Sequence, residues 1–130
     1  DLETLNNELS DLFKKVLGKE KLEVKVEKIK SEKVSAMITL SEETRRMQDM
    51  MKMYRMEGMG TDMFAGGEKL VLNANHPLVK FLGENKESEH VTMLCEQLYD
   101  LAMLSHKPLE PEAMTKFVER SNEIMLLLTK

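Results

Sequence analysis

The residues that could support catalysis or metal binding in this chain are few and widely separated. His76, His90 and His106 do not stand four residues from another histidine or from the cysteine, so none has the spacing of a helical metal site. The single cysteine, Cys95, falls among apolar residues of a predicted helix, which is typical of a small buried side chain rather than a nucleophile. In the glycine-rich stretch 58–67, Gly58-Met59-Gly60 is not followed by the Lys-Ser/Thr pair of a phosphate-binding loop. We therefore predict that the chain is not an enzyme and contains no cofactor or metal.

Methionine is the residue type with an unusual distribution. The chain has 12 methionines, and 7 of them fall between positions 47 and 63. Four apolar side chains in this segment share one helical face at spacings of three, four and seven residues: Met47, Met50, Met51 and Tyr54. Met53 and Met56 lie off that face, so a small sheet cannot cover every methionine. Because unbranched thioether side chains adapt to varied apolar surfaces, we predict that this face is exposed and binds apolar partners.

Two other interpretations of the methionine segment stay open. The methionines can be ordinary core residues, and thioethers are also soft ligands for copper(I), although the cluster contains no histidine or cysteine. The alternative function is a stand-alone, monomeric module that binds apolar peptides through a methionine-rich surface. Such modules usually carry a basic RNA-binding face, whereas the lysines here stand among glutamates and the formal net charge is −4. We expect no nucleic-acid partner.

The length and composition describe one globular unit. The 130 residues suit a single domain, 1–130, and 42% hydrophobic with 32% charged residues is typical of globular proteins. No apolar stretch approaches the roughly 20 residues that cross a bilayer, and no signal peptide is visible, so we expect no membrane partner. One cysteine suits a reducing compartment, and we expect a cytoplasmic protein. The chain begins within a helical pattern and without methionine, which we interpret as a fragment of a longer protein.

The elements that position these residues follow from hydrophobic spacing. Apolar residues spaced by threes and fours predict a first helix that ends at Gly18. The spacing then changes to two over 22–26 and over 34–40, which predicts two strands. A short polar connection, 30–33, lies between them. An antiparallel hairpin is the simplest arrangement of the two strands.

The middle of the chain predicts a second helix, a loop and a third strand. Ser41 is a good N-cap for a helix over 42–56, and the glycines of 58–67 then break all periodicity. Residues 69–73 predict a central strand. Pro77 fits the first position of a short helix that Gly83 stops. The predicted fold class is α+β: a small three-stranded sheet with a hairpin, packed with helices.

Two longer helices, over about 88–105 and 111–128, close the chain. The last one ends in four consecutive apolar residues, 125–128, which cover more than one side of a helix. A second copy would bury them by forming a four-helix bundle, and we predict such a homodimer. The alternative is that this face caps the sheet of its own chain. The predicted dimer interface contains Val91, Leu94, Leu98, Leu101, Phe117, Ser121, Ile124, Met125 and Leu128.

The order of these elements resembles a known family. A methionine-bearing helix and a glycine-rich loop precede a strand that ends at Asn73, followed after two residues by His76-Pro77. This Asn-x-x-His-Pro string in this order resembles the carboxy-terminal domain of the ninety-kilodalton heat-shock chaperone family, in its bacterial type. The resemblance covers nearly all of the chain.

This resemblance implies a function in protein folding under stress. It implies that the final two helices form a constitutive dimer contact. It also implies that the helix over 42–56 projects toward a central cleft and contacts unfolded or partly folded client proteins, with Met47, Met50, Met51 and Tyr54 as the expected contacts. ATP binding and hydrolysis would belong to an amino-terminal domain outside this chain. The expected function is therefore a chaperone dimerisation domain with a client-binding surface.

Overall fold

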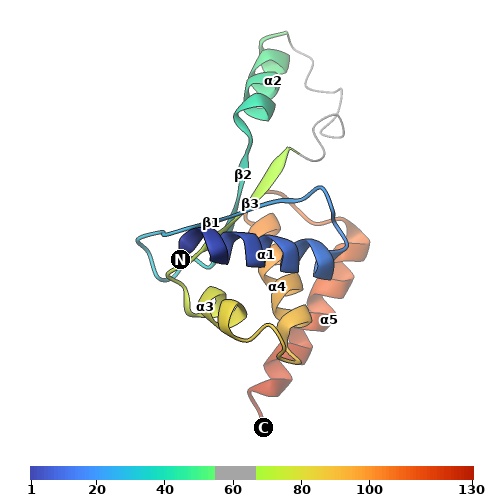
Figure 1. Cartoon of the computed structure of the whole chain (residues 1–130). Coiled ribbons are helices and arrows are strands. Elements are labelled where there is room, and N and C mark those ends of the chain that lie inside the picture. The colour runs from blue at the N-terminus through green and yellow to red at the C-terminus, as the bar shows by residue number, and fades with distance from the viewer. Residues whose placement is uncertain (55–66) are drawn as a thin grey trace.

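A computed structural model describes residues 1–54 and 67–130, which form helices around a small sheet (Figure 1). The elements in chain order are α1 (Leu2–Leu17), β1 (Glu23–Glu27), β2 (Ala36–Leu40), α2 (Glu42–Met53), β3 (Glu68–Asn73), α3 (Pro77–Glu84), α4 (Val91–Leu104) and α5 (Pro111–Leu127). The predicted α+β class is confirmed. Met56 and nearly all of the predicted glycine-rich loop lie outside the described residues.

The sheet has the strand order β1-β3-β2, so the predicted hairpin between the first two strands is wrong. β3 lies between them, parallel to β1 with Val24 opposite Leu70, and antiparallel to β2 with Ile38 opposite Leu70. The prediction of a central third strand is confirmed. β3 is the most buried of the three strands, with its last four residues buried, and the central position removes both of its edges from water.

Asn73, at the end of β3, holds the connection between β1 and β2 across the sheet. Its side chain is fully buried. Nδ2 donates to the carbonyl oxygens of Ser31 at 2.8 Å and Val34 at 2.7 Å. Oδ1 accepts from the amides of Ile29 at 3.0 Å and Asn75 at 2.9 Å. One amide side chain thus satisfies four polar groups, three of which belong to a segment about 40 residues distant in sequence.

The hydrophobic core lies between the sheet and the helices α1, α3 and α4. Leu9 and Phe13 of α1 are fully buried and pack with the apolar side chains of β1 and β3. α3 and α4 add the rest of the buried set: Val79, Leu82, Val91, Cys95, Leu98 and Ala102. Each such side chain contributes roughly 1.5–3 kcal/mol by leaving water. α5 stands outside this core, on the far side of α4 (Figure 1).

The predicted helix caps Gly18 and Ser41 are confirmed, as is the predicted start of α3 at Pro77. Gly18 ends α1 in the left-handed conformation, with φ of 66°. Ser41 Oγ accepts from the Thr44 amide at 3.1 Å, and His76 Nδ1 accepts from the Leu78 amide at 3.1 Å. Gly83 does not stop the short helix, because α3 continues through Glu84. A Cβ at Gly83 would lie 2.7 Å from Leu5 Cδ1, so this glycine allows α1 and α3 to approach closely.

α2 stands away from the body, beyond the ends of β2 and β3 (Figure 1). Its first turn is held against Gly67, whose carbonyl oxygen accepts from the Ser41 amide at 3.0 Å. Thr44 is the one buried residue of α2. A Cβ at Gly67 would lie 2.1 Å from Thr44 Oγ1 and 2.8 Å from Thr44 Cβ.

The substitution Gly67→Ala is therefore expected to displace the first turn of α2. The new methyl group would overlap Thr44 Cβ, which cannot move away by rotation of the side chain. We expect a cost of about 1–3 kcal/mol, as for other overpacked sites. The amides of Thr44 and Arg45 should exchange hydrogen faster. Gly83→Ala is the matched control, because the new methyl group would meet only the flexible end of the Leu5 side chain. Alanine also stabilises a helix by roughly 0.5–1 kcal/mol relative to glycine. Unchanged protection at Thr44 in Gly67→Ala would contradict this account.

Candidate functional site

α5 presents an exposed apolar surface in the part of the chain that the structure describes. The helix has 17 residues, and none of them is buried. Val118 is 49% exposed and Met125 is 55% exposed, and their spacing of seven residues places both on the same side of the helix. The surface also includes Leu101 of α4 and the end of α5 with the residues that follow: Leu126, Leu127 and Leu128. Such an apolar patch on a surface is a mark of an interaction site.

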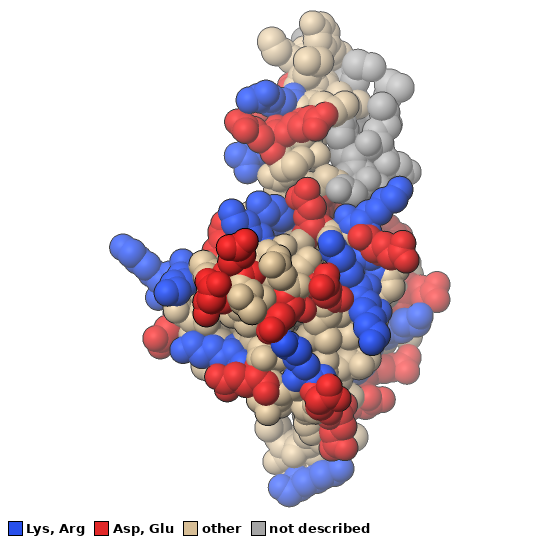
Figure 2. Space-filling view, in the orientation of Figure 1, with Lys and Arg blue, Asp and Glu red and all other residues tan. Residues whose placement is uncertain are grey.

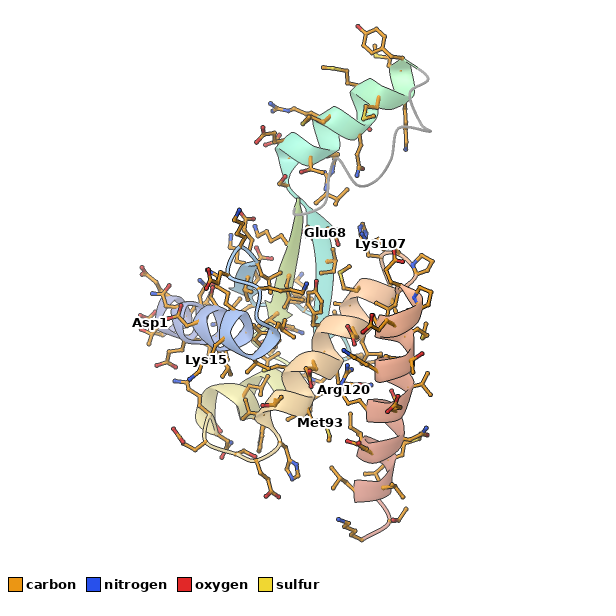
Figure 3. The ribbon with its side chains drawn as sticks, turned by 90° about the vertical axis from the view of Figure 1, so that its right-hand side faces the viewer. Asp1, Lys15, Glu68, Met93, Lys107 and Arg120 are labelled. Carbon is orange, nitrogen blue, oxygen red and sulfur yellow. The ribbon has the colours of Figure 1, made fainter. Side chains whose placement is uncertain are left out.

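A polar seam fixes α5 to α4. The guanidinium of Arg120 donates to Asp100 Oδ2 at 2.9 Å and to Gln97 Oε1 at 3.0 Å, and both charged side chains are largely buried. Gln97 Nε2 in turn donates to Ser121 Oγ at 3.0 Å. Figure 3 shows Arg120 between the two helices. Since this seam sets how the helices lie against each other, the apolar side of α5 stays directed away from α4.

The residues of the predicted dimer interface divide into three groups. Val91 and Leu98 lie in the core of their own chain, so their assignment to a dimer surface is wrong. Leu94, Phe117, Ser121 and Ile124 are half-buried. Leu101, Met125 and Leu128 are exposed.

Sequence reasoning missed part of the α5 surface and the whole of the seam. Val118 is exposed but was not part of the prediction, whereas Leu126 and Leu127 are exposed and belong to the run 125–128 that was predicted to need cover. The opposite charges of Asp100 and Arg120 on two adjacent helices were the available signal for the seam. That signal identifies a pair only when the rotation of each helix is known.

α2 presents the second apolar surface. Met47, Met50 and Tyr54 are exposed, as predicted from their shared face, with Met50 at 57%. Met51 is half-buried, and Met53, off the predicted face, is 81% exposed. The methionines therefore surround much of the helix with accessible thioether groups.

The thiol of Cys95 is buried and chemically quiet. The side chain is fully enclosed between α4 and the core, as predicted. Burial, with a smaller contribution from the charge of Glu96, raises its pKa to about 12. The thiol is therefore protonated at neutral pH, and a protonated buried thiol is a poor nucleophile.

The described residues contain neither a metal-binding cluster nor a membrane-spanning helix. Within residues 1–54 and 67–130, no group of three or more histidine, cysteine, aspartate or glutamate side chains could hold a metal ion. Of the helices in those same ranges, none is long and apolar enough to cross a membrane. No protein-family model matches the chain, and no curated protein matches it. The function is therefore argued from the two apolar surfaces.

Proposed function

We propose that this chain is the homodimerisation domain of an ATP-dependent chaperone, in which α4 and α5 pair two copies and α2 binds unfolded client proteins. The supporting observation is α5, a 17-residue helix that carries a broad set of apolar side chains and buries none of them within one chain. Leaving such a helix in water would favour aggregation. The proposed domain carries no enzymatic activity, and ATP hydrolysis belongs to another part of the parent chaperone.

A second copy is a suitable partner for α5. Two helices from each chain make a four-helix bundle with a two-fold axis, so the same patch on both copies becomes buried. With 17 residues α5 is about 25 Å long, and α4 with 14 residues is about 21 Å long, so both can run along a partner over several turns. Each methionine, valine or leucine removed from water there contributes roughly 1.5–3 kcal/mol.

The arrangement of α2 supports a separate role in client binding. α2 and the end of α5 lie at opposite ends of the molecule (Figure 1), so pairing through α5 leaves the methionine side chains of α2 accessible. Methionine side chains have three rotatable bonds and a polarizable sulfur, so one surface can adapt to different apolar segments. This property suits a chaperone, which must bind many unfolded sequences.

A monomeric peptide-binding module is the second candidate function. The exposed methionines of α2 support this function as well as they support client binding, because they can contact any apolar peptide. Sedimentation equilibrium of the isolated chain at tens of micromolar separates the two candidates. The dimerisation domain sediments at twice the chain mass of 15.0 kDa, whereas a mass of one chain would overturn our proposal.

The double substitution Met47→Ser, Met50→Ser tests the role of α2. Both side chains are exposed, so the free energy of unfolding should change by no more than about 1 kcal/mol. Protection of an aggregating client by the full-length protein should fall, because the apolar contacts are lost. Thermal unfolding of the variant measures its stability, and light scattering of the client measures its aggregation.

Met103→Ser is the matched control for that experiment. Met103 is only 9% exposed, so its replacement should cost about 2–5 kcal/mol of stability. A large loss of stability in the α2 double variant, with full client protection, would mean that the α2 methionines serve the core and not the client.

A further inference from the structure

A groove lined by lysines lies between the end of α1, the connection to β1, and α4. Its volume is about 1090 Å³, and Leu22, Tyr99 and Met103 supply its less polar parts. Five lysines line it: Lys14, Lys15, Lys19, Lys21 and Lys107. Figure 2 shows basic side chains gathered on the right-hand side of the body, over the carboxyl end of α1. The groove is separate from the exposed surfaces of α2 and α5.

The charge of this groove is opposite to that of the whole chain. Five lysines face three carboxylates, those of Asp11, Glu20 and Glu68, in a protein of formal net charge −4. Glu68 is mostly buried and pairs with Lys107 at 3.1 Å. Lys14 and Lys15 also stabilise the last turn of α1 through its dipole. That role does not account for the other lysines, which lie outside the helix.

Tyr99 gives the groove a side chain that can recognise a ligand. The ammonium group of Lys19 lies 5.7 Å from the centre of the Tyr99 ring, so charge and aromatic surface meet at one place. Burial, and the nearby charges of Glu68 and Asp100, raise the pKa of the Tyr99 hydroxyl. The hydroxyl therefore remains protonated at neutral pH and can donate a hydrogen bond to a carboxylate.

We propose that this groove binds an extended acidic peptide segment that carries an apolar side chain. The lysines come from α1, from the α1–β1 connection and from the segment after α4, so a path along the groove passes three separate segments of the chain. Carboxylates spread along a peptide match that path, and an apolar side chain of the peptide would contact Tyr99 and Met103.

A compact phosphate ligand fits this groove less well. Phosphate sites use the amide end of a helix or the planar fork of arginine. Here the helix presents its carboxyl end, which disfavours a concentrated negative charge, and no arginine among residues 1–54 and 67–130 lines the groove. A nucleic acid would meet three carboxylates and one aromatic ring, whereas single strands need successive stacking platforms.

The test is a binding titration followed by fluorescence anisotropy at about 0.1 M ionic strength, where the Debye length is about 10 Å. The probe is a fluorescein-labelled peptide of aspartate and glutamate residues around one phenylalanine. Binding to the wild-type chain should saturate. The double variant Lys19→Glu, Lys21→Glu should weaken it by about tenfold or more, since two attractions become repulsions, and added salt should weaken the wild type.

The matched control is Lys28→Glu, Lys30→Glu. These lysines are also exposed, lie outside the groove, and change the net charge by the same amount. The control should weaken binding by no more than about twofold, because charges beyond the Debye length are screened. A peptide with serine in place of phenylalanine should bind the wild type about threefold or more weakly, since an apolar contact is lost.

Three results would overturn the proposal. They are no saturable binding, equal losses in the two double variants, and displacement of the peptide by inorganic tripolyphosphate at a lower concentration than by the unlabelled peptide. If the Lys19→Glu, Lys21→Glu protein does not fold, Lys19→Gln, Lys21→Gln removes the same charges more mildly. The methyl resonance of Met103 in the wild type provides an independent measurement, and it should shift as the peptide is added.

Discussion

The substitution of both Val118 and Met125 by glutamate is expected to convert the proposed dimer into a folded monomer of 15.0 kDa. Each side chain is about half exposed in one chain, so a charge there remains in contact with water as long as the chain is alone. In the paired state, the same charge would be buried without a partner, at a cost of several kcal/mol. The two-fold axis would repeat that cost on the second copy. Sedimentation equilibrium, with thermal unfolding in parallel, measures both parts of the prediction.

Two further variants make this result specific to the α5 surface. Lys116→Glu changes the net charge by the same amount, at a residue whose side chain is 71% exposed, and it should leave the dimer intact. Leu98→Glu places a charge in the core, where Leu98 is 2% exposed, and should unfold the chain rather than separate two copies. If the Val118→Glu, Met125→Glu protein still sediments as a dimer, α5 is not part of the interface.

Replacing Asn73 with leucine is expected to cost about 3–5 kcal/mol of stability, a large part of the 5–15 kcal/mol that holds an ordinary domain together. The change leaves four polar groups without their partner: the carbonyls of Ser31 and Val34, and the amides of Ile29 and Asn75. Leucine is similar in volume, so packing alone cannot explain a loss of this size. Urea unfolding followed by circular dichroism gives the free energy.

Asn75 and an isosteric change at Asn73 provide the controls. The Asn75 side chain makes one hydrogen bond, to the carbonyl of Ile29 at 2.9 Å, so Asn75→Ala should cost about 0.5–1.5 kcal/mol. Asn73→Asp keeps the shape but places carboxylate oxygens against the carbonyls of Ser31 and Val34. That variant should be less stable at neutral pH than in mild acid, where the protonated group can donate again. Equal costs for Asn73→Leu and Asn75→Ala would contradict the account.

The features predicted well from the sequence are those that neighbouring residues decide. Gly18 ends α1 because glycine adopts the left-handed conformation readily, and Ser41 begins α2 because its hydroxyl accepts an amide three residues later. The exposure of α2 was also predictable. Its methionines lie on more than one side of the helix, and a small sheet can cover only one.

Strand order and helix rotation depended on contacts between distant parts of the chain. A spacing of two shows that Val24 and Val26 share a face, but it does not show which strand pairs with β1. The hairpin prediction failed because β3 pairs with both other strands, and Asn73 satisfies the β1–β2 connection from more than 35 residues away.

For the same reason, the predicted dimer interface on α4 and α5 includes both core residues and exposed residues. The sequence by itself determined that both helices are broadly apolar, and hence that some of their side chains need cover. Only the tertiary structure decided that Leu98 turns into the core while Val118 and Met125 remain exposed. The pair formed by Arg120 and Asp100 fixes the rotation of α5 against α4, and periodicity carries no information about that rotation because it describes each helix alone.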